Sequence, residues 1–121
     1  MSDSNTTVFE LRESVRIFCE ERDWDKYHNP KDLAIGAITE ASELLEHFRF
    51  KSVDEAERMM RDARTRTVIS GEIADVLFFL IRLCQKYDVD MSSALRAKIE
   101  TNAIRYSVNK AKGSNKKYSE L

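Results

Sequence analysis

Four carboxylates stand in two pairs of identical spacing, and they are the residues of this sequence best suited to chemistry. Glu40 and Glu43 lie three residues apart, and Glu72 and Asp75 repeat that spacing after 28 intervening residues. Residues three apart are neighbours on one face of a helix, so each pair is predicted to present its two carboxylates together. Such pairs are also common on solvated helix faces, which remains the alternative for either pair taken alone.

The residues around the two pairs argue against a solvated face. The segment 68–84, VISGEIADVLFFLIRLC, is apolar on nearly every side, and Glu40 lies in the similar segment LAIGAITEASELL. A helix that is apolar all round is typically buried, and burying an isolated carboxylate costs on the order of several kcal/mol. Arg49 and Arg82, basic residues that follow the two pairs in sequence, are not spaced to neutralise four acids. Mg²⁺ accepts carboxylate ligands and often bridges them to phosphates, so the four acids are predicted to hold Mg²⁺ beside a phosphate group.

The positions of helix start signals predict the elements that carry these acids. Thr7 with Glu10 and Ser52 with Glu55 have the capping-box spacing, and proline after Asn29 fits the first helical position. Glycine and proline are otherwise scarce, and no alternating strand pattern occurs. The chain is therefore predicted to be all-α, a compact bundle of four main helices plus a short one, the third along the chain. The expected helices are about 7–22, 30–48, 52–63, 65–87 and 91–107, with an aromatic-rich loop at 23–29.

The length and composition indicate one domain over residues 1–121, with about 109–121 as a C-terminal tail. A chain of 121 residues with 42% hydrophobic residues can build one core but not two. The longest apolar run, 76–81, is too short to cross a bilayer, and no charged leader with an apolar stretch precedes the first helix. Cys19 and Cys84 have neither metal-knuckle nor redox spacing. These features predict a cytoplasmic protein with reduced thiols and no membrane partner.

The formal net charge of −1 conceals an uneven distribution of charge along the chain. Basic residues dominate from residue 98 onward, whereas the two acid pairs that are predicted to be buried lie in the middle of the chain. This arrangement suits a ligand that brings both a metal ion and polyanionic phosphate. It does not match the broad basic surface expected of a protein that binds polymeric nucleic acid.

The paired acids and three further segments resemble one protein family. ExxE at 40–43 and ExxD at 72–75 are similar to the signature of the MazG-like all-α nucleotide pyrophosphohydrolases. ERDWDKYHNPKDL at 21–33, KIETNAIRY at 98–106 and the C-terminal GSNKKYSEL resemble segments of the dCTP pyrophosphatase branch. The match covers about residues 18–121, and the four motifs occur in order.

The resemblance implies hydrolysis of a nucleoside triphosphate between its α and β phosphates, giving the monophosphate and pyrophosphate. It implies a homotetramer, assembled as a dimer of dimers with active sites between subunits. It also implies Mg²⁺ as cofactor, with Glu40, Glu43, Glu72 and Asp75 as ligands. The substrate-binding residues that it implies lie near the base (Trp24, His28 and Phe50, the last where the branch usually has tryptophan) or near phosphate and sugar (Lys98, Asn102 and Tyr106).

Two positions depart from the pattern of this branch, and both leave the metal site intact. Phe79 stands one turn after the last acid, where tyrosine is usual, and Ser107 follows Tyr106 where proline is usual. Both departures bear on selectivity for base and sugar.

Triphosphate cleavage requires charge neutralisation and a positioned water more than an activated side-chain nucleophile. Glu43 is the predicted catalytic carboxylate that orients or deprotonates this water. Lys98 and Lys117 are candidates for countering charge on the leaving pyrophosphate. For the aromatic and basic candidates, simple packing or solvent exposure is the alternative role.

Three hypotheses for the function follow. The first is a magnesium-dependent (deoxy)nucleoside triphosphate pyrophosphohydrolase that cleans the nucleotide pool, with dCTP-like substrates favoured. The second is the same fold acting on dUTP or a phosphoribosyl-nucleotide. The third is a non-catalytic helical interaction module in which the buried acids are structural.

Overall fold

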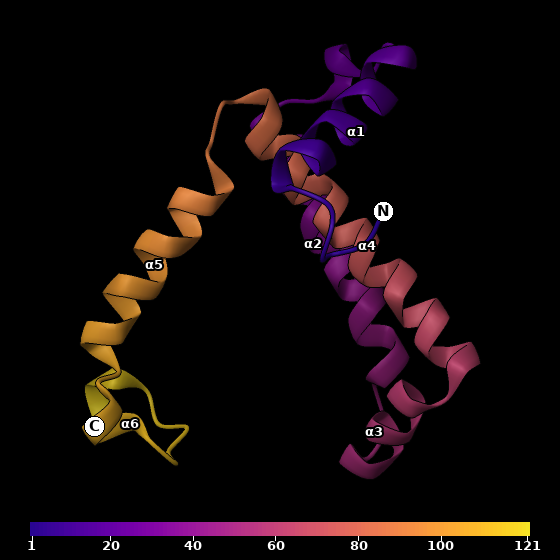
Figure 1. Ribbon diagram of the computed structural model, residues 1–121. Helices are drawn as coiled ribbons and strands as arrows, with labels where there is room; N and C mark the ends of the chain where they lie inside the picture. Colours follow the sequence, from indigo (N-terminus) through magenta and orange to yellow (C-terminus); the bar gives the residue numbers. More distant parts are fainter. The chain divides into compact units, whose positions relative to one another are not determined.

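The computed structural model describes all residues, 1–121, and every regular element in it is helical (Figure 1). The chain forms two compact units, residues 1–89 and residues 90–121, which are described separately. The first unit contains α1 (Val8–Glu21), the short 3₁₀ helix η1 (Asp25–Tyr27), α2 (Pro30–Phe48), α3 (Val53–Arg61) and α4 (Ala63–Lys86). The second contains α5 (Met91–Arg105), α6 (Val108–Ala111) and the 3₁₀ helix η2 (Tyr118–Glu120). The predicted all-α class is therefore confirmed.

Local capping interactions fix where the helices of the first unit begin. Thr7 accepts a hydrogen bond from the Glu10 amide while the Glu10 side chain accepts from the Thr7 amide, which completes the predicted capping box. Asn29 caps α2 by accepting from the amide of Asp32, with proline at the first helical position as predicted. Ser52 caps α3 in the same way through the amide of Glu55.

Helices α2 and α4 lie side by side and form the centre of the first unit (Figure 1). They are antiparallel, because Gly36 near the start of α2 meets Phe79 late in α4, whereas His47 at the end of α2 meets Glu72 earlier in α4. The two predicted pairs of acids, one on each of these helices, are thereby brought to the same level. Helix α1 packs on α4, with the Phe18 and Phe78 rings edge to face at 5.8 Å.

The core of the first unit is small, and part of the apolar surface of α4 remains exposed. The buried apolar residues are Cys19, Leu33, Ile69 and Ile81. The prediction that α4 is buried on all sides is wrong for the single chain, because Ile73, Leu77 and Leu80 each keep nearly half of their surface exposed. No helix of the structure is both long and apolar enough to cross a bilayer.

The second unit holds the basic C-terminal segment, which is more regular than the predicted tail. Helix α5 ends at Arg105 rather than near Ser107, and α6 and η2 follow it. The Tyr118 ring of η2 packs edge to face on Tyr106 at 5.9 Å, and the Arg105 guanidinium lies 4.9 Å from the centre of the Tyr118 ring. Through these contacts η2, near the C-terminus, packs against the last residues of α5.

Candidate functional site

Three of the four predicted metal ligands converge between α2 and α4. Glu40, Glu43 and Glu72 each offer a carboxylate oxygen, and these oxygens all lie within 4.8 Å of one another. Glu40 and Glu43 meet because they are three residues apart on α2, and Glu72 faces them from the antiparallel neighbour. Three carboxylates this close repel one another unless a cation or protons compensate their charge.

Glu72 is bound at one oxygen and unpartnered at the other. Its Oε1 lies 3.1 Å from Nε2 of His47, which stands one turn after Glu43 on α2. Its Oε2 is buried and has no hydrogen-bond partner within the protein. A buried acceptor without a donor is costly, and carboxylate oxygens are the ligands that hard divalent cations such as Mg²⁺ prefer. The residues present therefore fit a metal ion of this type.

The environment of Glu40 disfavours its charged form. Partial burial, its hydrogen bond to Glu43 and the negative charges of Glu43, Asp75 and Glu72 together raise the pKa of the Glu40 carboxyl, with burial as the largest cause. A bound cation would reverse this effect by favouring the ionised form.

Asp75 stands beside the cluster rather than within it. Its carboxylate is not among those that converge within 4.8 Å, yet its charge acts on Glu40. Asp75 and Glu43 are exposed, whereas Glu40 and Glu72 are half-buried. The cluster thus has an inner side of two shielded acids and an outer side open to a ligand.

The aromatic loop after α1 places two of the predicted base-pocket residues together. Trp24 is half-buried and packs edge to face on Phe18 at 5.5 Å and on His28 at 6.1 Å. Trp24 and His28 flank the 3₁₀ helix η1, which the sequence-based prediction treated as loop. Together they form a half-buried aromatic corner.

Phe79 joins the aromatic corner to the α2–α4 contact. Its ring packs at 5.6 Å on Phe78, whose ring contacts Phe18. The Phe79 ring also lies directly against Gly36 of α2, where a Cβ atom would overlap it. A residue with no side chain at position 36 is therefore what lets this ring lie between the two helices.

Phe50 is held away from the remainder of the first unit. It follows α2 with a φ of 65°, an unusual value for an aromatic residue, and 90% of its surface is exposed. Its ring contacts the Arg49 guanidinium at 4.6 Å. The structure does not bring Phe50 together with Trp24, His28 or Phe79.

The remaining predicted site residues belong to the second unit. Lys98 and Asn102 lie four residues apart on α5 and therefore share one exposed face. Tyr106 caps the end of α5, and Lys117 precedes η2 with its Nζ 6.0 Å from the centre of the Tyr118 ring. These four residues are thus gathered on α5 and the segments that follow it.

The sequence-based prediction missed two residues that contact the site. His47 lies on the same face of α2 as Glu40 and Glu43, at helical spacings of seven and four, so its position was a usable signal. Arg82 binds the aromatic loop, and it lies seven residues after Asp75 on the corresponding face of α4. Neither contact is visible from local sequence, because its two partners are far apart along the chain.

The site is thus a cluster of acids that could hold a divalent cation, placed between the two antiparallel helices of an all-α protein. Residues 35–121 match the model of the MazG-like family, and the chain belongs to this family.

Named relatives extend the similarity over nearly the whole chain. dCTP pyrophosphatase 1 of Bos taurus is 33% identical over 118 residues, which are 98% of this chain and 70% of the relative. The Mus musculus protein of the same name is 34% identical over 115 residues, 95% of this chain and 68% of the relative. A pyrophosphatase from Archaeoglobus fulgidus has a crystal structure that superimposes with a TM-score of 0.78 at 34% identity, covering 88% of this chain and 98% of the other.

Proposed function

We propose that this protein is a nucleoside triphosphate pyrophosphohydrolase that uses Mg²⁺ and favours dCTP-like substrates. The observation that carries the proposal is the convergence of Glu40, Glu43 and Glu72, the last of which also has a buried carboxylate oxygen without a partner. The enzyme class rests on the relatives, which are dCTP pyrophosphatases and a pyrophosphatase. The two free cysteines agree with a reducing compartment, and we place the reaction in the cytoplasm, as house-cleaning of the nucleotide pool.

The four acids are assigned to the metal. Glu40, Glu43 and Glu72 would hold Mg²⁺ directly, with Asp75 beside them at the open side of the cluster. When bound, Mg²⁺ neutralises phosphate charge and lowers the pKa of a coordinated water. His47 orients the Glu72 carboxylate through its hydrogen bond to Oε1 and leaves Oε2 free for ligation.

Glu43 is assigned to the attacking water. It is the exposed member of the cluster, so its carboxylate can reach a water at the substrate side and accept its proton. Attack on the α phosphorus then breaks the bond to the bridging oxygen and releases pyrophosphate. Lys98 and Lys117 are assigned to the charge of the leaving pyrophosphate, and Asn102 and Tyr106 to phosphate or sugar.

The base is assigned to the aromatic residues. Trp24 and His28 form the half-buried corner that would receive it, and Phe79 lies between this corner and the acids. Phe50, which is 90% exposed, would contribute to the pocket of a second copy of the chain rather than its own.

We also propose that the protein is a homotetramer, assembled as a dimer of dimers. The exposed apolar surface of α2 and α4 supports this proposal. Ile35, Ile38 and Leu45 on α2 and Leu77 on α4 are each between 46% and 71% exposed. Several large apolar side chains exposed on one pair of packed helices favour an interface with another protein surface. We expect a tetrameric mass by analytical ultracentrifugation, reduced by Leu45→Glu but not by Ile17→Glu on α1. A monomeric wild-type protein would contradict this assembly.

The decisive experiment measures pyrophosphate released, in the presence of Mg²⁺, from each of the eight common (d)NTPs, from dUTP and from a phosphoribosyl-nucleotide. Release from dCTP faster than from all the others is the expected result. Faster turnover of dUTP, or turnover of a phosphoribosyl-nucleotide alone, would replace the substrate while keeping the enzyme class. No release from any substrate, with no change in thermal stability on adding Mg²⁺ and nucleotide, would favour the non-catalytic interaction module.

A further inference from the structure

Arg82 is the one charged residue that the first unit buries completely. It lies on α4 with 1% of its surface exposed, although Lys, Arg, Asp and Glu are almost never fully buried without partners. A guanidinium in such a position must be paired and hydrogen-bonded, since an uncompensated buried charge is strongly destabilising. The hydrogen-bond partners of Arg82 therefore indicate its role in the fold.

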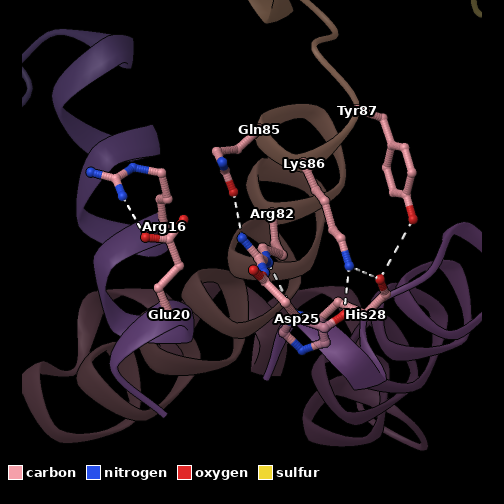
Figure 2. A network of polar contacts seen from close by, with 8 residues as sticks. All are labelled: Arg16, Glu20, Asp25, His28, Arg82, Gln85, Lys86 and Tyr87. Atoms are coloured by element: carbon pink, nitrogen blue, oxygen red, sulfur yellow. Dashed lines mark hydrogen bonds and ion pairs between the residues drawn. The ribbon is translucent and has the colours of Figure 1, made fainter. Parts of the chain in front are cut away.

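The partners of Arg82 come mainly from the aromatic loop (Figure 2). Its Nη2 forms an ion pair with Asp25, its Nε donates to Nδ1 of His28 at 2.9 Å, and its Nη1 donates to Oε1 of Gln85 at 2.5 Å. Asp25 and His28 stand at the beginning and just beyond the end of η1, the turn that follows Trp24. The buried side chain of Arg82 therefore contacts residues at both ends of η1.

Lys86, one helical turn further along α4, holds the backbone of the same turn (Figure 2). Its Nζ donates to the carbonyl oxygens of Asp25, at 2.6 Å, and of His28. The hydroxyl of Tyr87 lies 3.5 Å from the His28 carbonyl. Residues 82 and 86 share a face of α4 with Asp75 and Phe79, so the aromatic corner is fixed to the helix that carries two of the acids.

The bond from Arg82 also determines which nitrogen of His28 carries the proton. Arginine has no acceptor, so its Nε must donate and Nδ1 of His28 must accept. A neutral imidazole with Nδ1 as acceptor carries its hydrogen on Nε2, which is then a hydrogen-bond donor. Partial burial and the positive charges of Arg82 and Lys86 lower the pKa of His28 against the opposing effect of Asp25, so the ring is neutral at neutral pH.

We propose that Arg82 is a positioning residue for base recognition, which holds the Trp24–His28 corner in place and fixes His28 as an Nε2–H donor. This inference rests on the proposed function, since it takes the corner to be where the base binds. A fixed donor selects a base edge that offers an acceptor, either a carbonyl oxygen or an unprotonated ring nitrogen. The edge of cytosine carries both kinds of acceptor.

The position of Arg82 along α4 suits this role. Arg82 follows Asp75 by seven residues, or about 10 Å at 1.5 Å per residue. This separation is comparable to the span from a base to its phosphates. One rigid helix therefore sets the distance between the acids that would meet the phosphates and the corner that would meet the base.

The first test reads the tautomer of His28 directly by ¹⁵N NMR of the imidazole rings. The chain has two histidines, so His47 serves as the internal reference. We expect the wild-type protein to show an unprotonated Nδ1 and a protonated Nε2 at His28 near pH 7. A protonated Nδ1 would overturn the proposal without any variant having to fold.

The second test compares Arg82→Met and the conservative Arg82→Lys with Arg64→Met, an exposed arginine on the same helix. In both Arg82 variants we expect a mixture of His28 tautomers, faster amide hydrogen exchange at residues 24–28, and a KM for the triphosphate raised about tenfold with kcat changed less than threefold. Arg64→Met should change none of these. Arg82→Lys keeps the positive charge and is the fallback if Arg82→Met fails to fold.

The outcomes separate this proposal from the proposed function. An Arg82→Lys protein that keeps the wild-type tautomer, exchange rates and KM would refute positioning. Loss of the tautomer with an unchanged KM would refute the role in base recognition. A wild-type protein without pyrophosphate release would refute the proposed function, while the tautomer and exchange measurements, made without substrate, would still decide whether Arg82 positions the corner.

Discussion

Glu43→Gln is expected to lower kcat/KM for the preferred triphosphate by about 100-fold or more, which corresponds to about 2.7 kcal/mol of lost transition-state stabilisation. Glutamine keeps the size of the side chain but removes both the charge that binds a cation and the site that accepts a proton. Because Glu43 is exposed, the substitution leaves the packing of α2 unchanged, and the melting temperature should stay within a few degrees of wild type.

Glu46→Gln is the matched control for this prediction. Glu46 lies on the same helix one turn later, is exposed, and pairs only with Arg49 at 3.3 Å. An exposed pair of this kind contributes little, so activity should remain within twofold of wild type. Both activities are measured as pyrophosphate release at saturating Mg²⁺. If Glu43→Gln were as active as Glu46→Gln, Glu43 could be neither catalytic nor an essential ligand.

The helix starts of the first unit could be predicted because capping is a local interaction. Thr7, Asn29 and Ser52 each bond an amide three residues away, within the reach of a sequence pattern. The start of α4 was placed two residues late, at 65 instead of 63. Asp62 both ends α3 and caps α4 through the amide of Thr65, so no loop separates the two helices.

Distant contacts explain what the sequence did not predict. The turn η1 is held by Arg82 and Lys86, more than 50 residues further along the chain, and nothing within residues 23–29 indicates them. The turn η2 likewise has a contact outside its own segment, between the rings of Tyr118 and Tyr106, twelve residues earlier. The exposed apolar face of α4 was predicted as core because a pattern of apolar residues does not reveal whether another element of the same chain covers them.

The convergence of three of the four acids could be predicted from their spacing, whereas the contact between His47 and Glu72 and the place of Asp75 could not. Equal spacing on two apolar helices was enough to bring Glu40, Glu43 and Glu72 together. The bond between His47 and Glu72 depends on the register of α2 against α4, which tertiary packing determines. Asp75 lies beside the converging oxygens for the same reason, since its distance from α2 depends on that register.

Glu72→Gln is expected to stabilise the metal-free protein while abolishing its stabilisation by Mg²⁺. In the absence of metal, Glu72 brings a third negative charge to within 4.8 Å of Glu40 and Glu43, and its buried Oε2 has no donor. Glutamine removes that charge, keeps an oxygen for His47, and supplies an amide that can donate to a neighbouring carboxylate. The relief of repulsion should raise the free energy of unfolding by on the order of 1 kcal/mol, or a few degrees in melting temperature.

The response of the melting temperature to Mg²⁺ distinguishes a metal ligand from an acid that only supports the fold. A ligand that binds only the folded state raises its stability with concentration, so the wild-type melting temperature should rise as Mg²⁺ is added. In Glu72→Gln this rise should be lost, and with it the activity. Thermal melts at a fixed protein concentration, with EDTA or increasing Mg²⁺, measure both effects. A variant less stable than wild type in EDTA would contradict the repulsion argument, because the Glu72 charge would then stabilise the fold without any metal.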